Sequence, residues 1–279
     1  MVYLFFSKSA INTFYCLFMS PTIVLIADYG SGDPAFTEVT LQLKTYLPEG
    51  DIIQQSTPPF STLNTGFWIY QIALTPNLKN TYIYSNTAPR KEDKAAQLNN
   101  RGEKLMYARL KNGFEIIAVN AGYCFSFVKP YIEEFAYVNV AHEGSQFRSR
   151  DMFPEGVAKM ILKQPDFKGE SADPTLIPDY PALTVASIDG YGNIKTTMRQ
   201  SEAHFVPGQQ LIITINRRKH LTTFTDGIFN IQDGELALAP GSTGHDDKFM
   251  ELVLRGGSAY FMFERPLVES SFTVKPIVV

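Results

Sequence analysis

The sequence lacks several features that mark large functional classes. It has only two cysteines, Cys16 and Cys124, which make neither a disulfide framework nor a metal-ligand spacing. It has no excess of positive charge, because the formal net charge is -3, and this disfavours nucleic acid as a partner. Internal repeats and low-complexity tracts are absent. These absences predict a globular protein of a reducing, cytoplasmic compartment that holds no metal.

The amino-terminal segment MVYLFFSKSAINTFYCLFM also lacks a long uninterrupted apolar run. Lys8 and Pro21 interrupt it, which disfavours a membrane span, and no small-residue cleavage site follows it. A short signal peptide remains one interpretation of this segment. We expect instead that residues 1–21 are an extension outside the folded part, with Met19 as a natural start.

The first half of the chain alternates strand and helix patterns. A continuous apolar run over 22–27 predicts a buried strand, and Pro34 can begin a helix that carries apolar residues at helical spacing. The same reasoning predicts strands over 51–55, 81–85, 105–110 and 114–119, and helices over 67–74 and 153–162. We therefore predict an α/β domain over 22–164, a mostly parallel sheet with flanking helices, interrupted by a charged loop or insertion over 90–104.

The second half differs from the first in composition and in its predicted secondary structure. Four prolines among charged and small residues indicate a linker over 165–181. Short strands without long helices between them are then predicted over 183–188, 211–215, 228–231, 251–254 and 259–263. The pattern predicts a smaller all-β domain over 182–279, built as a sandwich or barrel.

The most informative stretch is IVLIADYGSGDPAF, where the first strand ends on Asp28 and passes into a glycine-rich turn. Many nucleotide sites begin in this way, with backbone amides and one carboxylate at the carboxyl edge of a sheet. Asp28, Gly30 and Gly32 resemble the first motif of class I methyltransferases, but the next strand ends in Gln-Gln-Ser and lacks that family's acid. A second interpretation is a tight turn of purely structural use.

A third interpretation depends on several motifs in order. ADYGSGDPAFTEV, DIIQQSTPPF, QFRSRDMFP, ASIDGYGNIKTT and MELVLRGGSA together resemble the family of S-adenosylmethionine hydroxide adenosyltransferases and their relatives, the fluorinases and chlorinases. DYGSGDP is similar to the family's D-F-G-x-x-D-P, and SIDGYGNIKTT to its I-D-x-F-G-N-x-x-T-N. The resemblance runs from about residue 22 to the carboxyl end. It implies S-adenosylmethionine as the ligand with no separate cofactor, bound between subunits of a homotrimer.

The resemblance assigns ligand contacts in the first domain to three residues. Asp28 would accept hydrogen bonds from both ribose hydroxyls, a geometry suited to one ionised carboxylate. Asp33 would pair with the methionine ammonium group, and Phe60 would lie against the ribose and adenine. Each residue also has a plain structural interpretation, since Asp33 before Pro34 can cap a helix and Phe60 can be part of a core.

Four more ligand contacts are implied in the second domain. Asp189 and Asn193 would offer an acid and an amide at the methionine end, with Tyr191 in place of the family's phenylalanine. Ser242 matches the serine of the family's N-S-x-G segment. The alternative for the segment 189–193 is an ordinary hairpin turn, because Asn and Gly readily adopt positive φ.

The sequence departs from the family where water is activated. Hydroxide-transferring members position water with an Asp, an Arg and a His. Here Asn86 stands in the Asp position and Arg148 in the His position, while the Arg position falls in the insertion, with Arg101 or Lys104 as substitutes. Water is a poor nucleophile at neutral pH, so these losses predict weakened catalysis.

Ser149 indicates a different relationship. Phe-x-Ser-Arg-acid over 147–151 is closer to the fluorinase form F-Y-S-R-E, in which the serine helps to hold a halide. We therefore take Asn86, Arg148 and Ser149 as the candidate catalytic positions. The predicted function is binding of S-adenosylmethionine with weakened displacement at C5′, giving methionine and adenosine. A non-catalytic binding protein and a halide-using 5′-halogenase are the alternatives.

Overall fold

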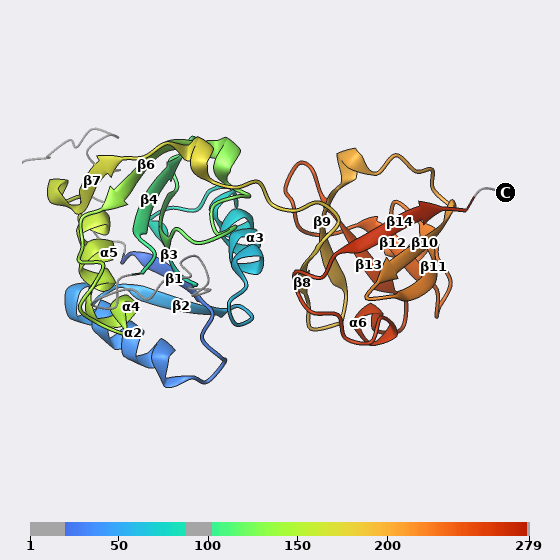
Figure 1. The fold of residues 1–279 in the computed structure, drawn as a ribbon, viewed down its shortest axis with the longest axis horizontal. Coiled ribbons are helices and arrows are strands. Elements are labelled where there is room, and N and C mark those ends of the chain that lie inside the picture. Colours follow the sequence, from blue (N-terminus) through green and yellow to red (C-terminus); the bar gives the residue numbers. More distant parts are fainter. Residues whose placement is uncertain (1–19, 88–101, 278–279) are drawn as a thin grey trace, which may run out of the picture.

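The computed structural model describes residues 20–87 and 102–277, which form an α/β domain followed by a β domain (Figure 1). Residues 1–19 and nearly all of the charged segment 90–104 lie outside the described residues. Among the helices of the described ranges, none is both long enough and apolar enough to cross a membrane.

The first domain contains one mixed sheet of seven strands in the order β2-β1-β3-β5-β4-β6-β7. Its strands are β1 (Thr22–Ala27), β2 (Asp51–Ser56), β3 (Thr81–Asn86), β4 (Leu105–Leu110), β5 (Glu115–Val119), β6 (Ile132–Val138) and β7 (Lys168–Ser171). The strands β2, β1, β3 and β5 pair in parallel, whereas β4, β6 and β7 pair antiparallel. The sheet is thus less parallel than predicted, because the tight turn at Gly113 (φ 83°) returns β5 directly against β4.

Four α-helices of the described ranges flank this sheet: α2 (Pro34–Tyr46), α3 (Thr62–Ala73), α4 (Arg148–Asp151) and α5 (Phe153–Ile161). Helix α2 begins where predicted and buries Phe36, Val39 and Leu43. Helix α3 begins at Thr62, earlier than predicted, because the Ser61 hydroxyl accepts a hydrogen bond from the Asn64 N–H (3.2 Å) and caps it. Helices α2, α4 and α5 lie on one side of the sheet, and α3 lies on the side of the β domain (Figure 1).

The second domain is a mostly antiparallel half-barrel with the strand order β14-β10-β11-β12-β13-β9-β8. Its strands are β8 (Val185–Ile188), β9 (Ile194–Arg199), β10 (Gln210–Ile215), β11 (Arg218–Phe224), β12 (Leu236–Pro240), β13 (Phe249–Leu254) and β14 (Phe272–Pro276). A bridge between Thr184 and Ser271 brings the two edges of the sheet together. The predicted fold class, α/β followed by a β domain, is confirmed.

Two predicted strands of this domain are wrong. The run 228–231 forms the 3₁₀ helix η6 (Ile228–Asn230), in which Phe229 is 80% exposed, so the run does not alternate into the core. The run 259–263 contains α6 (Ala259–Met262), because the Ser258 hydroxyl accepts from the Phe261 N–H (3.2 Å) and caps a helical turn. Both runs are too short for periodicity to separate helix from strand.

The segment 165–181 does more than connect the domains. It contains η3 (Pro165–Phe167), strand β7 on the edge of the first sheet, and η4 (Pro174–Leu176). The remaining 3₁₀ helices of the described ranges are η2 (Lys129–Tyr131) and η5 (Gln200–Glu202). The chain then crosses to β8, at the side of the half-barrel that faces α3 (Figure 1).

Direct contacts fix the two domains against each other. In α3, the Asn64 side chain donates to the Ala186 carbonyl (2.7 Å). The Arg199 guanidinium lies 3.7 Å from the centroid of the Phe249 ring and donates to the Tyr70 hydroxyl (3.1 Å). A cation stacked on an aromatic face and hydrogen-bonded across the junction resists a change in domain orientation.

Candidate functional site

The carboxyl ends of β1, β2 and β3 lie side by side. Ala27 is in register with both Ser56 and Asn86, so the residues that follow β1 and β2 meet the last residue of β3 at one edge of the sheet. At this edge one Asp28 oxygen accepts a hydrogen bond from the Phe60 N–H (3.0 Å). Phe60 has a φ of 64°, and the residue is 48% exposed. The structure therefore joins two of the predicted ligand contacts.

Asp33 lies in the glycine turn that follows. Its N–H donates to the Gly30 carbonyl (2.9 Å), and its carboxylate accepts from the Ala35 N–H (2.8 Å) at the start of α2. Gly32 adopts a φ of 82°, which a side chain would strain. Asp33 is thus a helix cap, as its structural interpretation predicts, and its exposed position leaves it at the surface of the turn.

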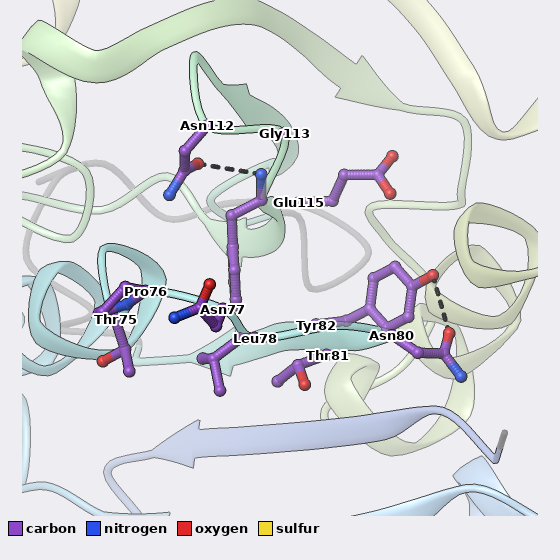
Figure 2. Close-up of a pocket in the computed structure, with 11 residues that line it drawn as sticks. Thr75, Pro76, Asn77, Leu78, Asn80, Thr81, Tyr82, Asn112, Gly113 and Glu115 are labelled. Carbon is purple, nitrogen blue, oxygen red and sulfur yellow. Dashed lines mark hydrogen bonds between the residues drawn. The ribbon is translucent and has the colours of Figure 1, made fainter. Parts of the chain in front are cut away.

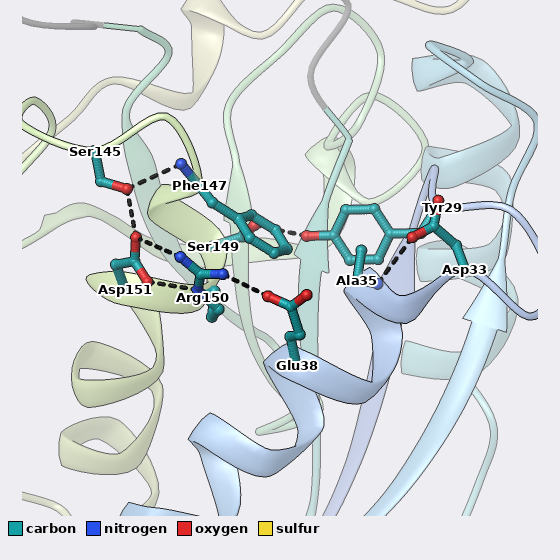
Figure 3. Close-up of polar contacts among 9 residues, drawn as sticks. All are labelled: Tyr29, Asp33, Ala35, Glu38, Ser145, Phe147, Ser149, Arg150 and Asp151. Carbon is teal, nitrogen blue, oxygen red and sulfur yellow. Dashed lines mark hydrogen bonds and ion pairs between the residues drawn. The ribbon is translucent and has the colours of Figure 1, made fainter.

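A second group of side chains meets beside Asp28. The Tyr29 and Ser149 hydroxyls are 2.6 Å apart, and the Asn86 amide donates to the Tyr29 oxygen (3.1 Å). The Tyr84 hydroxyl donates to the Ser149 carbonyl (2.8 Å). Figure 3 shows the Tyr29 hydroxyl directed at Ser149. Two predicted catalytic residues, Asn86 and Ser149, are therefore linked through Tyr29.

This group is electrically neutral. Burial raises the pKa of Tyr29 well above its ordinary value, and the neighbouring Asp28 charge adds to that rise, although the bond to Ser149 opposes it. Asn and Ser side chains do not ionise at ordinary pH. The three groups can donate and accept hydrogen bonds, but none of them can take a proton from water at neutral pH.

Arg148, the third predicted catalytic residue, is directed elsewhere. Its guanidinium donates to the carbonyls of Glu103 (2.9 Å) and His142 (3.1 Å), and it lies 3.6 Å from the Glu103 carboxylate. Burial lowers the pKa of Arg148, while the Glu103 charge partly restores it. These contacts join Arg148 to the segment before β4 and to the segment after β6. Lys104, a candidate for the missing Arg, lies 4.6 Å from the centre of the Tyr137 ring, and Arg101 is outside the described residues.

The neighbouring charges hold α4 in place. Arg150 pairs with Glu38 of α2 and with Asp151 (2.6 Å), and the Ser145 hydroxyl donates to Asp151 (2.5 Å) (Figure 3). The bond from Arg150, together with the one from Ser145, lowers the pKa of Asp151. This carboxylate is already engaged as an acceptor, so it is poorly suited to act as a base.

The predicted contacts of the second domain lie on the hairpin between β8 and β9. One Asp189 oxygen accepts from the N–H groups of Tyr191 and Asn193 (both 3.0 Å), and the other accepts from the Asn193 amide (3.0 Å). Gly192 completes the turn with a φ of 80°. Tyr191, at the tip, is 84% exposed. The segment is a hairpin turn that presents an aromatic ring to its surroundings.

A buried ion pair lies behind this hairpin. The Lys195 ammonium is 2.7 Å from Glu251 and 3.6 Å from Asp189, and the side chains of Lys195 and Glu251 are only 7% and 6% exposed. The Thr243 hydroxyl donates to the same Glu251 oxygen (3.5 Å). Ser242, which precedes Thr243, is exposed. The pair therefore connects the hairpin with the loop that carries Ser242.

Known structures share this architecture. An uncharacterized conserved protein from Thermotoga maritima matches with a TM-score of 0.72 and 16% identity, over 91% of this chain and 100% of that one. A conserved hypothetical protein from Thermus thermophilus matches with a TM-score of 0.66 and 17% identity, over 93% of this chain and 100% of that one. These similarities establish the fold. The sequence matches no established family profile and no curated protein.

A cavity of about 220 Å³ lies at the other end of the parallel strands (Figure 2). It is lined by the residues before and at the start of β3 and by the β4–β5 turn, including Asn77, Tyr82 and Asn112, and by none of the predicted site residues. Ligands of open α/β sheets bind beyond the carboxyl ends of the strands, so this cavity is not our candidate site. Within the described ranges, no group of three or more His, Cys, Asp or Glu residues is arranged to hold a metal.

Our sequence reasoning missed three residues of this arrangement. Tyr29 stands where the family motif has phenylalanine, so its added hydroxyl was a visible signal. Lys195 and Glu251 lie in the largely buried runs IKTTM and MELVL, which carry no other charge, and a charge inside such a run indicates a partner. The pairing itself was not readable, because it depends on β9 lying beside β13.

Removal of the Tyr29 hydroxyl should weaken the fold modestly. Tyr29→Phe leaves the Asn86 amide and the Ser149 hydroxyl without this partner, and we expect a loss of about 0.5–1.5 kcal/mol in the free energy of unfolding. Urea denaturation measures it, with Tyr46→Phe, at a 40% exposed position of α2, as the control. An unchanged stability would show that the hydrogen bonds contribute nothing.

The same variant should also differ from the wild type in how its stability depends on pH. The folded state keeps the Tyr29 proton at a pH where the unfolded chain, with a pKa near 10, has lost it. This contribution to stability is complete below about pH 10 and is lost as the pH rises above it. As the pH is raised from about 9 to about 11, the free energy of unfolding of Tyr29→Phe should therefore fall by less than that of the wild type.

Proposed function

We propose that the protein binds S-adenosylmethionine and displaces methionine from its C5′ carbon, as an adenosyltransferase of the hydroxide type with weakened activity. Water would attack C5′ in line with the C5′–S bond, whose electron pair would leave with methionine. The remaining proton would go to solvent. The products would be methionine and adenosine.

One observation carries this proposal. The ordered motifs of the sequence converge on two surfaces: Asp28, Phe60, Asn86 and Ser149 gather at one sheet edge, and the hairpin 189–193 is linked through Lys195 and Glu251 to the loop that carries Ser242. Convergence of residues that are far apart in the chain is expected if they serve one ligand, and is not required of isolated turns. The sheet edge is also where α/β domains bind nucleotides.

The main task of the protein in this reaction is to place the nucleophile and the substrate. The sulfonium is already a good leaving group, so alignment of the nucleophile with C5′ and exclusion of other water supply most of the rate. Asp28 would hold the ribose diol, and the exposed face of Phe60 would pack on the nucleoside. Ser149 and Tyr29 would orient the nucleophile by hydrogen bonds.

A second candidate is a protein that binds the ligand without turnover. The neutrality of the Asn86, Tyr29 and Ser149 group favours it, because no member can accept a proton from water. The same neutrality suits a nucleophile that arrives as an anion, such as a halide, because an anion needs no base. In such a halide-using enzyme, Ser149 would help to hold the halide.

One experiment separates the three. Calorimetry with S-adenosylmethionine tests binding, and chromatography of the mixture with and without added halide tests turnover. Binding with slow formation of adenosine supports the proposal, binding without products supports the second candidate, and a 5′-halogenated product supports the third. Absence of binding at millimolar ligand would overturn all of them.

The proposal includes a homotrimer whose site is completed by another copy. An exposed aromatic side chain lies close to the Tyr191 hairpin: Phe261, on α6, is 60% exposed. Gly192 accepts a hydrogen bond from the Tyr260 N–H (2.9 Å), which ties α6 to the hairpin. Apolar side chains gathered on one face favour burial against a partner, and a second copy would bring this face to the Asp28 edge.

We therefore expect a particle mass of about 94 kDa, three times the chain mass of 31.3 kDa, in light scattering at micromolar concentration. Tyr191→Asp places a charge at the centre of the proposed contact and should shift the particle toward the monomer. Leu176→Asp, at an 80% exposed position between the domains, is the control and should leave the trimer intact. A monomeric wild type would count against both the trimer and a site shared between copies.

A further inference from the structure

The second domain buries a charge pair that the proposed chemistry does not use. Lys195 on β9 and Glu251 on β13 are register partners, and their charged groups are 2.7 Å apart. Ion pairs of this kind are costly to bury, and well-packed apolar residues often replace them without loss of stability. Fold stability alone therefore does not account for the pair.

The surroundings of the pair suggest its use. On one side, Lys195 is 3.6 Å from Asp189, whose carboxylate organises the hairpin 189–193. On the other side, Glu251 accepts from the Thr243 hydroxyl (3.5 Å), and a Cβ placed on Gly241 would lie 1.9 Å from its carboxylate oxygen. The backbone of the Ser242 loop thus packs directly on Glu251.

We propose that Lys195 and Glu251 are positioning residues that hold the hairpin 189–193 and the Ser242 loop in one fixed arrangement. This inference rests on the proposed function in one respect, namely that the two loops form the ligand surface of this domain. Lys195 attracts the carboxylates of Asp189 and Glu251 together and so adds a side-chain link between the hairpin before β9 and the loop before β13, two strands that pair with each other. A pair of apolar residues would preserve the packing of the strands but would lose this link.

Of the three charged residues Asp189, Lys195 and Glu251, Asp189 is the most exposed to solvent. Its side chain is 25% exposed, and it accepts hydrogen bonds from the two backbone N–H groups that shape the tip of the hairpin. Release of Lys195 frees the Asp189 carboxylate to turn toward water. The N–H groups of Tyr191 and Asn193 then lose their acceptor for part of the time, and the hairpin opens more often.

The test uses the full chain with Lys195→Met and Glu251→Gln combined, which removes both charges at nearly constant volume. Hydrogen exchange is measured at the amides of Tyr191 and Asn193, and at β10 for comparison. We expect hairpin exchange to accelerate about tenfold or more while β10 is unchanged. Combined Arg218→Met and Glu264→Gln, which removes an exposed ion pair of the same domain, is the control and should leave the hairpin unchanged.

Two results would overturn the inference. One is an unchanged rate of amide hydrogen exchange in the hairpin of a folded variant. The other is an equal acceleration of exchange in the hairpin and in β10, which would mean that the ion pair stabilises the domain as a whole. If the double variant does not fold, Asp189→Asn decides, because it keeps the buried pair and removes the charge that faces Lys195, together with the acceptor of the Asn193 amide, while the asparagine oxygen can still accept from the N–H groups of Tyr191 and Asn193. Hairpin exchange should again accelerate, and an unchanged rate contradicts the proposal.

A measurement of ligand affinity distinguishes a failure of this inference from a failure of the proposed function. The Kd for S-adenosylmethionine should rise about tenfold in the double variant if the loops form the ligand surface. A wild type that does not bind S-adenosylmethionine refutes the proposed function, yet the exchange measurements still decide whether the pair positions the loops. An unchanged Kd beside accelerated exchange would mean that the loops are held by the pair but do not bind this ligand.

Discussion

Adenosine should form from S-adenosylmethionine slowly or not detectably, by comparison with an S-adenosylmethionine hydroxide adenosyltransferase that has the full Asp, Arg and His set. Asn86 donates its amide to Tyr29, and Arg148 is held by Glu103 and by backbone carbonyls, so neither can remove a proton from water. Loss of general-base assistance costs about 10²–10⁴-fold, or about 3–5 kcal/mol of barrier. Single-turnover chromatography of adenosine at enzyme excess measures the rate.

Introducing the residues that S-adenosylmethionine hydroxide adenosyltransferases have at these positions should raise the rate only in combination. In Asn86→Asp the new carboxylate would lie within reach of the Tyr29 hydroxyl and accept its proton as a hydrogen bond, so the single change should gain little. Asn86→Asp with Tyr29→Phe frees the carboxylate and should gain more. Arg148→His removes the cation beside Glu103, whose side chain is 10% exposed, and should cost stability before it aids catalysis.

A rapid wild-type reaction would contradict this account. Water-dependent formation of adenosine at the rate of an adenosyltransferase with the full Asp, Arg and His set would mean that another group accepts the proton. Asp151 is a poor candidate because Arg150 and Ser145 already occupy its carboxylate. The plain hydrolase function would then be right, and the meaning we attach to Asn86 and Arg148 would be wrong.

The strands and helices that the sequence predicted well are those whose signals are local. Strand β1 is a continuous apolar run, and α2 has both a capping aspartate and an apolar stripe. The failures at 228–231 and 259–263 concern short runs in which the same residues suit either structure. Ser258 decided the second case by capping a turn, an effect stronger than the apolar composition.

The site was predictable as a set of positions but not as a set of contacts. Motif order brought attention to Asp28, Asn86 and Ser149, yet the link through Tyr29 depends on α4 packing beside β3. The orientation of Arg148 was not readable either, because its partners lie in distant segments. Long-range packing, which leaves no periodic signal in the sequence, decides such contacts.

Asp28→Ala should weaken binding of S-adenosylmethionine by about 1.5–3 kcal/mol, roughly 10- to 150-fold in Kd, the range for hydrogen bonds to a charged group. Asp28 lies at the carboxyl end of β1, where the resemblance assigns it both ribose hydroxyls. The structure adds a complication: Asp28 also accepts from the Phe60 N–H, so its removal perturbs the loop that carries Phe60.

Asp28→Asn separates the two effects. The asparagine oxygen can still accept from the Phe60 N–H, while its NH₂ group cannot accept from a ribose hydroxyl. If Asp28 binds the ribose, calorimetry should show weak binding in both variants, with the thermal stability of Asp28→Asn close to that of the wild type. Near wild-type affinity in Asp28→Asn, with only Asp28→Ala impaired, would mean that Asp28 acts through the Phe60 loop. Unchanged affinity in both folded variants would remove Asp28 from the ligand site, because a charged acceptor for the diol cannot be lost without effect.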